Sequence, residues 1–234
     1  MFDETLIKVR LREGLLLDIR FKEPVHCTGY FDGQGWHSCP YSNEGTKKCD
    51  FCRAKDISRL YTIADESGFK EIYNRIKNNE FSVYLALFGD KIKCGVTQSK
   101  RLWKRVKEQG ARFFAEIMRF RDMKTAYGWE KYLQEFYGFK NSISFIDKLK
   151  DKDNVELLNQ ALTKIKEDFS EYILKDISIH HIPFKSFPNA KRVDYIKGRI
   201  VSLRSDIVFF KNNLIYYVPM KKMEGKTIEI NKFV

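Results

Sequence analysis

The spacing of apolar residues changes along the chain, and each change predicts a different element. Residues 6–21 alternate between apolar and polar positions on both sides of Glu13-Gly14, which predicts two strands joined by a turn. Residues 69–79 carry apolar side chains at helical spacing. Residues 81–97 contain two short apolar runs around Gly89-Asp90, a combination that favours a β-hairpin.

Helix and strand patterns then alternate after the predicted hairpin. We expect Ser99 to cap a helix that ends at Gly110, because a serine hydroxyl satisfies helix-start amides and glycine tolerates the left-handed end. Residues 111–120 predict a strand. Residues 122–139 predict another helix, which is closed by Gly138.

The C-terminal part begins with charge and continues with β-rich sequence. Residues 147–154 are rich in lysine and aspartate and predict a linker. Asp153 or Asn154 is expected to cap a long amphipathic helix that runs to about Leu174. Residues 177–234 alternate and turn at residues 211–213, which predicts a small β-sheet or barrel.

Together these patterns predict an α+β protein in three consecutive parts. Residues 1–68 form a β and metal-binding region, and residues 69–146 form an α/β module with a small antiparallel sheet and flanking helices. Residues 147–234 form the long helix and the β-rich tail.

Composition sets the broad class. Hydrophobic residues make up 43% of the 234 positions and aromatic residues 15%, which supports a packed core and excludes a disordered chain. No apolar run reaches the roughly 18 to 20 residues of a membrane span, and the N-terminal residues lack a signal-peptide core. We therefore expect a soluble, cytoplasmic protein without a membrane partner.

Positive charge is clustered in the central part. The formal net charge is +12, and 11 basic residues accompany 3 acidic ones between Lys91 and Thr125, with Trp103 among them. Clustered cations attract phosphate and release counterions. A solvated basic surface is the simpler alternative, but the clustering favours nucleic acid, DNA or RNA, as the partner. The residues predicted to contact it are Lys91, Lys100, Arg101, Lys104 and Arg112.

Four of the five cysteines, Cys27, Cys39, Cys49 and Cys52, fall within 26 residues. Cys49 and Cys52 form a CxxC pair, whose spacing lets two thiolates reach one metal ion. The glycine-rich stretch around Cys27 and Cys39 can bend to bring the other two sulfurs to the same ion. Thiolates suit zinc, and four of them close its coordination shell. The sequence therefore predicts one structural zinc ion.

The alternative interpretations of these cysteines have less support from the sequence. His26 or His37 lies close enough in sequence to replace one cysteine as a ligand. Disulfides need an oxidising compartment. A redox CxxC is expected at the start of a helix rather than in a loop rich in glycine, serine and asparagine. Cys94 lies in an apolar run and is predicted to be a small core residue.

Two short strand motifs stand on either side of the predicted hairpin turn. They are Val83-Tyr84-Leu85 and Lys93-Cys94-Gly95-Val96-Thr97. Arg105 follows on the next predicted helix, with Arg101 as its rival, Glu130 lies on the later helix, and Asn141 follows that helix. In this order the motifs resemble the GIY-YIG nuclease family over about residues 81–141.

The resemblance implies phosphodiester hydrolysis. Tyr84 would help to activate a water molecule, Arg105 would contact the scissile phosphate, and Glu130 would hold Mg2+ or Mn2+. Lys93 stands where the family has a second tyrosine. Lysine cannot copy the hydrogen bonding of a phenol, although it can bind phosphate or act as a base if its pKa falls.

Two functions therefore stay open. One is a metal-dependent endonuclease whose catalytic residues are Tyr84, Lys93, Arg105 and Glu130. The other is an inactive RNA-binding factor, with the ribosome as a candidate partner. A protein-interaction adaptor would leave the charge cluster unexplained. The chain also resembles an uncharacterised, mainly archaeal family with a cysteine-rich N-terminal region, a central YLALFGDKIKCGVT-like segment and EQGA after the basic helix. That resemblance implies no activity.

Overall fold

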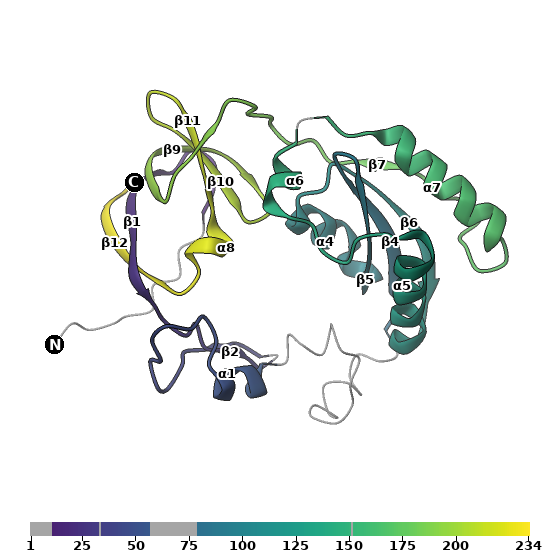
Figure 1. The fold of residues 1–234 in the computed structure, drawn as a ribbon, viewed down its shortest axis with the longest axis horizontal. Coiled ribbons are helices and arrows are strands. Elements are labelled where there is room, and N and C mark those ends of the chain that lie inside the picture. The colour runs from purple at the N-terminus through teal and green to yellow at the C-terminus, as the bar shows by residue number, and fades with distance from the viewer. Residues whose placement is uncertain (1–10, 33, 57–78, 151) are drawn as a thin grey trace. The chain divides into compact units, whose positions relative to one another are not determined.

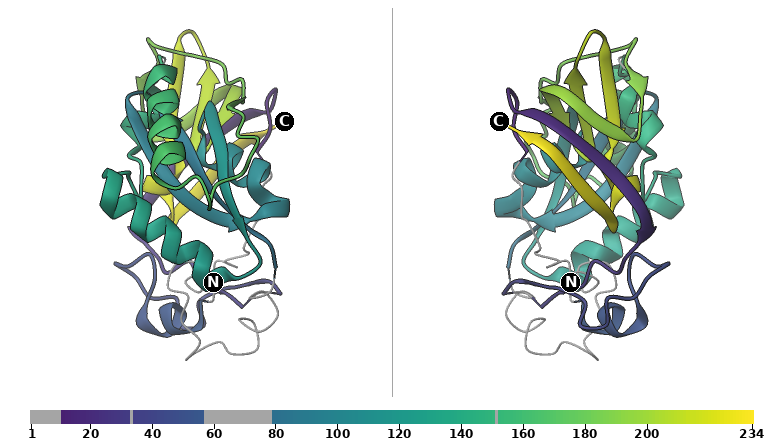
Figure 2. Two further views of the ribbon diagram at one scale, coloured as in Figure 1. Left: turned by 90° about the vertical axis from the view of Figure 1, so that its right-hand side faces the viewer. Right: turned by 90° about the vertical axis from the view of Figure 1, so that its left-hand side faces the viewer.

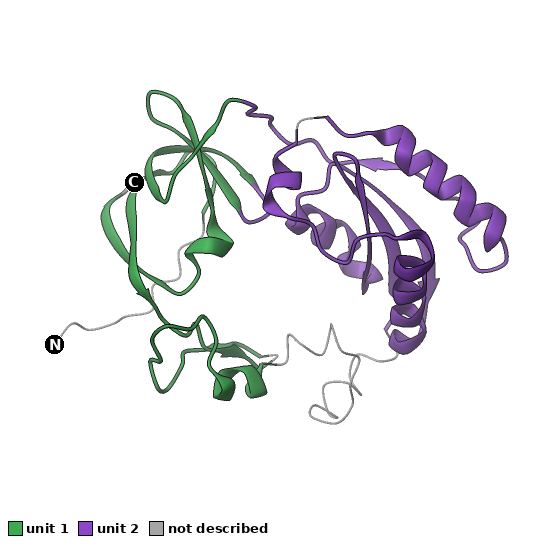
Figure 3. Ribbon diagram, viewed as in Figure 1, with its two compact units in different colours: residues 1–63, 189–203, 207–234 green, residues 64–188, 204–206 purple. Residues whose placement is uncertain are grey.

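The computed structural model describes residues 11–32, 34–56, 79–150 and 152–234 (Figure 1). The chain divides into two compact units (Figure 3). Unit 1 contains Met1–Ile63, Asn189–Leu203 and Ile207–Val234, and unit 2 contains Ala64–Pro188 and Arg204–Asp206. This division differs from the three consecutive parts expected from the sequence, because strands from both ends of the chain pair in one sheet.

Unit 1 is built around that sheet, whose strand order is β12-β1-β9-β10-β11-β8. Strand β1 pairs antiparallel with both β9 and β12, and the right-hand view of Figure 2 shows β1 and β12 side by side. The strands are β1 (Leu16–Val25), β8 (Lys191–Arg192), β9 (Tyr195–Arg204), β10 (Ile207–Lys211), β11 (Ile215–Pro219) and β12 (Lys226–Phe233), and the short helix α8 (Met220–Met223) precedes β12.

The alternation of apolar and polar residues along the strands explains which side chains form the core of unit 1. In the first half of β1 every second residue, Leu17 and Ile19, is buried, and these side chains pack against Ile196, Ile200 and Phe210. The predicted turn at Glu13-Gly14 is present, with Gly14 at a φ of +88°. The predicted strand before this turn lies largely outside the described residues. The β-rich C-terminal tail is confirmed.

A small cysteine-containing subregion completes unit 1. It consists of the hairpin of β2 (Tyr30–Phe31) and β3 (Trp36–His37) and the short helix α1 (Asp50–Lys55). Two backbone hydrogen bonds join it to the sheet region, from His26 N to Gly225 O at 2.7 Å and from Gly45 N to Val25 O at 2.8 Å.

Unit 2 contains a sheet with the strand order β5-β4-β6-β7. Its strands are β4 (Phe81–Phe88), β5 (Lys91–Gln98), β6 (Phe113–Phe120) and β7 (His180–His181), and all pairs are antiparallel. The helices are α4 (Leu102–Gln109), α5 (Met123–Tyr137), α6 (Phe145–Leu149) and α7 (Val155–Asp168), and the 3-10 helix η2 (Ser99–Arg101) leads into α4. The α+β class predicted from the sequence is confirmed.

The central strand β4 is buried on both faces, which is why its sequence reads as a continuous apolar run. Val83 and Leu85 belong to a core that includes Leu133 of α5 and Leu158 of α7. Tyr84, Ala86 and Phe88 point the other way, into a core that includes Leu102 and Val106 of α4. Helices α5 and α7 therefore cover one face of the sheet and α4 covers the other.

Several predicted helix ends are confirmed, and some are wrong. Gly110 and Gly138 close α4 and α5 in the left-handed conformation. Asn154 caps α7, but this helix ends at Asp168. Ser99 does not cap α4. It begins η2, and its hydroxyl accepts a hydrogen bond from Ser82 Oγ at 2.8 Å. The helix predicted over residues 69–79 falls almost entirely outside the described residues.

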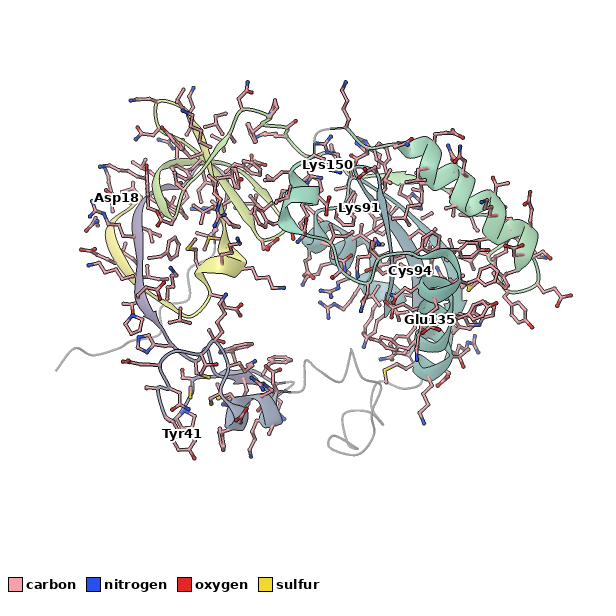
Figure 4. All side chains as sticks on the ribbon, in the orientation of Figure 1. Asp18, Tyr41, Lys91, Cys94, Glu135 and Lys150 are labelled. Atoms are coloured by element: carbon pink, nitrogen blue, oxygen red, sulfur yellow. The ribbon has the colours of Figure 1, made fainter. Side chains whose placement is uncertain are left out.

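The linker predicted at residues 147–154 is wrong in its first half. Asp147 is buried on α6 and accepts a hydrogen bond from Lys91 Nζ at 2.9 Å. Lys150 pairs with Asp90 at 2.6 Å and with Asp147 at 3.6 Å (Lys91 and Lys150 are labelled in Figure 4). Charges that look solvated in the sequence are thus paired with charges on the β4–β5 hairpin. In the described part of the chain, no helix has the length and apolar character to cross a membrane.

Candidate functional sites

The first site is the cysteine cluster of unit 1. Cys27 follows β1, Cys39 follows β3, Cys49 is the N-cap of α1, and Cys52 lies one turn into that helix. The four Sγ atoms lie within 4.8 Å of one another, and those of Cys39 and Cys49 are 3.8 Å apart. A tetrahedral zinc site with Zn–S bonds of about 2.3 Å requires sulfurs about 3.8 Å apart. The tetrad can therefore hold a metal ion.

Local electrostatics favour the thiolate at Cys49 and oppose it at Cys52. The backbone amide of Cys52 donates to the Cys49 sulfur and lowers the pKa of Cys49 to about 6. Burial raises the pKa of Cys52, whose side chain is fully enclosed. The backbone amide of Cys49 also donates to Cys27 Sγ at 3.3 Å. A cation among the sulfurs would favour the charged form of all four.

Neither histidine considered as an alternative ligand belongs to the metal-binding group found among the described residues, and the ring of His37 has other partners. His37 Nε2 lies 2.7 Å from Asp32 Oδ2, and its ring stacks on Tyr30 with centroids 5.0 Å apart. His26 forms a β-bridge with Glu44. Within the described ranges, the four cysteines are the one group of three or more side chains placed to share a metal ion.

The interpretation of the CxxC pair as part of a loop is wrong. The pair starts a helix, since Cys49 caps α1. The position of the pair therefore does not distinguish a redox site from a metal site. Cys27 and Cys39 favour the metal site, because they bring two further sulfurs to the pair from earlier parts of the chain.

The second site surrounds Gly95 in unit 2. Gly95 of β5 is the direct cross-strand partner of Tyr84 of β4. A Cβ atom at Gly95 would lie 2.6 Å from the Tyr84 hydroxyl oxygen and 2.7 Å from Cζ, so the phenol occupies the space that any other side chain would need. The phenol is fully buried and donates a hydrogen bond to Gln109 Oε1 at 3.0 Å. Gly95 is thus neither a turn nor a bulge glycine.

Charged residues from three elements act on one another around this phenol. Burial raises the pKa of Glu130 on α5, whereas Lys93, the backbone amide of Val96 and Arg105 hold it down. Burial lowers the pKa of Lys93 on β5, against the attraction of Glu130. Burial also raises the pKa of Tyr84, against the nearby charge of Arg105 on α4. The four residues predicted to be catalytic therefore lie within electrostatic range of one another.

Amide side chains and backbone groups fix the arrangement. Lys93 Nζ donates to the backbone carbonyl of Asn141, and the 139–141 segment runs beside β5 through backbone bonds that include Cys94 N to Lys140 O at 3.2 Å. Gln134, one turn after Glu130, donates to Cys94 O at 3.3 Å. Cys94 is a fully buried core residue, as predicted.

Chemically, the site offers two cations and one carboxylate beside a buried phenol. Arg105 and Lys93 can attract an anion such as phosphate, and Glu130 offers one oxygen ligand. Arg105 is half-exposed, and its guanidinium lies 4.0 Å from Glu108. Arg101, the alternative to Arg105, lies 3.9 Å from the same carboxylate.

The residues predicted to bind nucleic acid divide into two groups. Lys100, Arg101 and Lys104 are exposed on η2 and α4, whose buried side carries Leu102 and Val106. Lys91 and Arg112 do not belong to this surface. Lys91 pairs with Asp147, and the largely buried Arg112 side chain lies 3.6 Å from Asp153. Their positive charges are offset within unit 2, and their assignment as nucleic-acid contacts stays a prediction.

Two features of unit 2 were missed from the sequence. Gln109, in the EQGA segment, had no assigned role and proves to be the acceptor of the Tyr84 hydroxyl. Its place at the end of α4, just before the C-cap Gly110, is the signal that could have found it. The second feature is an open apolar pocket of about 500 Å3, lined by Thr125, Gly128, Trp129, Tyr132, Phe169 and Tyr172.

Comparison with known protein families matches residues 17–227 to the family described as "Protein of unknown function (DUF2797)". The chain belongs to this family. The match covers most of the described chain in both units and includes the four cysteines and the residues around Gly95. No curated protein and no solved structure matches the chain. Because the family description states no activity, function has to be inferred from the two sites, and both resemblances noted in the sequence stay predictions.

Proposed function

We propose that this protein is a zinc-containing nucleic-acid-binding protein whose unit 2 is a GIY-YIG nuclease-like module. The observation that carries the proposal is the meeting of Tyr84, Lys93, Arg105 and Glu130 around Gly95. These four residues were selected by the order of short motifs in the sequence, and they come from the separate elements β4, β5, α4 and α5. That they lie around one glycine supports the resemblance to the GIY-YIG nuclease family.

Zinc is the proposed metal of the cysteine tetrad. Four sulfurs with the spacing of a tetrahedron suit zinc, and four protein ligands leave no open position for a substrate. The ion would stabilise a subregion that has two-residue strands and one six-residue helix and therefore little core of its own. The proposed role is structural.

Nucleic acid is the proposed partner because exposed cations continue from the Gly95 site along one helix. The η2–α4 segment carries Lys100, Arg101, Lys104, Arg105 and Lys107, all exposed, against the single acidic residue Glu108. A phosphate backbone matches such a surface and gives a salt-dependent affinity. DNA and RNA offer the same phosphate chemistry, and binding assays with each decide between them.

Endonuclease activity is the second candidate, and the position of Glu130 favours it. A divalent cation bound there would polarise a phosphate oxygen, while Arg105 would hold the anion and Lys93 would supply further positive charge. The burial of Tyr84 beneath Gly95 favours the alternative, an inactive RNA-binding or ribosome-associated factor, because a fully enclosed phenol does not reach a water molecule.

A binding titration tests the proposal. Wild-type protein is mixed with labelled single-stranded RNA, single-stranded DNA and duplex DNA at several salt concentrations. Replacing Lys100, Arg101 and Lys104 with alanine should lower the salt slope by about 0.7–0.9 for each phosphate that is no longer neutralised. A matched variant that replaces Lys131, Lys164 and Lys166, exposed on α5 and α7, should keep the wild-type slope. Affinity that does not change with salt overturns the proposal.

A cleavage assay decides between enzyme and binding factor. Wild type, Glu130→Gln and the control Glu135→Gln are incubated with branched DNA, single-stranded RNA and tRNA in Mg2+ or Mn2+. Glu135 lies on the same helix but is exposed and pairs with Lys131 at 3.8 Å. Cleavage by wild type and Glu135→Gln alone establishes the nuclease. Binding without cleavage by all three proteins establishes the inactive factor.

A further inference from the structure

Trp103 is an exposed ring on the basic helix α4. Its side chain is 54% exposed, although the residues before and three positions after it, Leu102 and Val106, are buried in the core under α4. An exposed tryptophan ring presents a large aromatic face, and tryptophan is enriched where proteins contact a partner. The ring is therefore a candidate contact, and its surroundings decide for which kind of partner.

The ring is held in place from below. It meets Phe114 of β6 edge to face, with centroids 4.8 Å apart and planes at 89°, and it lies 5.0 Å from the ring of His180 on β7. Two supports from neighbouring strands restrict the rotation of Trp103. A ligand that stacks on a ring already fixed loses less conformational entropy than one that must order it.

Lysines stand on both sides of the ring. Lys100 precedes Trp103 by three positions and Lys107 follows it by four, and residues at these spacings share one helix face. Both lysines are exposed. No carboxylate among the described residues forms an ion pair with Lys100, Lys104 or Lys107. Lys100, Trp103 and Lys107 therefore form a row of cation, aromatic ring and cation, whose charges can attract an anionic ligand.

The other two tryptophans have different surroundings. Trp36 carries the ammonium group of Lys48 5.0 Å from its ring centroid. Trp129 is partly buried and packs against Phe169 and Tyr172. Trp103 thus combines exposure, rigid support and flanking lysines.

We infer that Trp103 is a stacking platform for one base of a single-stranded nucleic acid, with Lys100 and Lys107 contacting the phosphates on either side. This inference rests on the proposed nucleic-acid binding and narrows its substrate class. Bases in a duplex hide their faces against one another, whereas unpaired bases can stack on an aromatic side chain. Seven residues of helix span about 10 Å, so the two lysines reach phosphates on both sides of one stacked base.

The test compares single strands with duplex. Full-length Trp103→Leu, Trp103→Phe and the control Phe136→Leu are titrated with labelled oligothymidylate and with a duplex of equal length. Phe136 is a 58%-exposed aromatic residue on α5, on the opposite side of the sheet. Trp103→Leu should weaken single-strand binding about ten-fold and duplex binding less than about two-fold. Trp103→Phe keeps the packing on Phe114 and should retain most of the affinity.

A second pair of variants tests the lysines. Lys100→Ala combined with Lys107→Ala should lower the single-strand salt slope by about 1.4, because each neutralised phosphate contributes about 0.7. Trp103→Leu should leave that slope unchanged. Circular dichroism melts confirm that each variant is folded.

The outcomes separate the two proposals. Salt-dependent binding in which folded Trp103→Leu and wild type have equal affinity for the single strand overturns the stacking inference and leaves nucleic-acid binding intact. An equal loss for single strand and duplex also overturns it. Absence of binding to either probe by wild type overturns the proposed function itself.

Discussion

The close approach of Tyr84 to Gly95 makes Gly95→Ala a decisive perturbation. Glycine in a strand lowers stability by about 0.5–1 kcal/mol relative to alanine. Replacing a glycine that has no special role with alanine should therefore raise the free energy of unfolding. At Gly95 the new methyl group would instead lie 2.6 Å from the Tyr84 hydroxyl oxygen and 2.7 Å from Cζ. These distances are well inside van der Waals contact, so the ring or β5 must move.

The cost follows from how firmly the ring is held. Tyr84 is fully buried in a core with Leu102 and Val106, and its hydroxyl is bonded to Gln109. Forcing one methyl group into a packed core costs about 1–3 kcal/mol. Loss of the Gln109 hydrogen bond adds about 1 kcal/mol. After the intrinsic preference for alanine is subtracted, we expect Gly95→Ala to lower the free energy of unfolding by about 2 kcal/mol.

Urea denaturation measures this effect, and a double-mutant cycle assigns its cause. Because Tyr84→Leu removes the ring, Gly95→Ala in that background should cost at least about 1 kcal/mol less than in the wild type. Gly128→Ala is the matched control, since a Cβ at Gly128 meets no atom within 4 Å. A gain in stability for Gly95→Ala, or additive effects of the two substitutions, would show that the phenol does not exclude a side chain at this position.

Further predictions concern the metal, a buried ion pair and pH. Cys52→Ser should abolish stoichiometric zinc binding, measured by metal analysis, and one tightly held ion per wild-type chain is expected. Asp153→Ala should lower the free energy of unfolding by about 3 kcal/mol in urea titrations, because it leaves the Arg112 charge and the Gly89 amide without this carboxylate. Gly128→Ala should stabilise α5 by up to about 1 kcal/mol in thermal melts, since glycine is unfavourable within a helix. The free energy of unfolding should fall as pH rises above about 10, because tyrosine ionises there in the unfolded chain whereas burial raises the pKa of Tyr84 in the folded protein. Urea titrations above and below this pH measure the fall, and Tyr84→Phe should make it smaller.

Local signals along the sequence determined much of unit 2. The hairpin around Gly89-Asp90 and the ends of α4 and α5 at Gly110 and Gly138 were predictable, because the backbone at each glycine has φ between +64° and +80°. The cysteine cluster was also predictable, since sulfurs close in sequence with flexible spacers can reach one ion. A local signal can also mislead: Ser99 precedes a basic helical segment as a cap would, but it begins η2 instead.

Contacts between distant residues were decided only by the tertiary structure. The pairing of β1 with β9 and β12 depends on backbone hydrogen bonds between the two ends of the chain, for which an alternating pattern specifies no partner. The sequence places Lys91 and Arg112 among the predicted nucleic-acid contacts, and in the fold each lies beside an aspartate more than 40 positions away. Charge in a sequence gives the sign of an attraction, and the fold alone decides which cations are already paired and which remain exposed on α4.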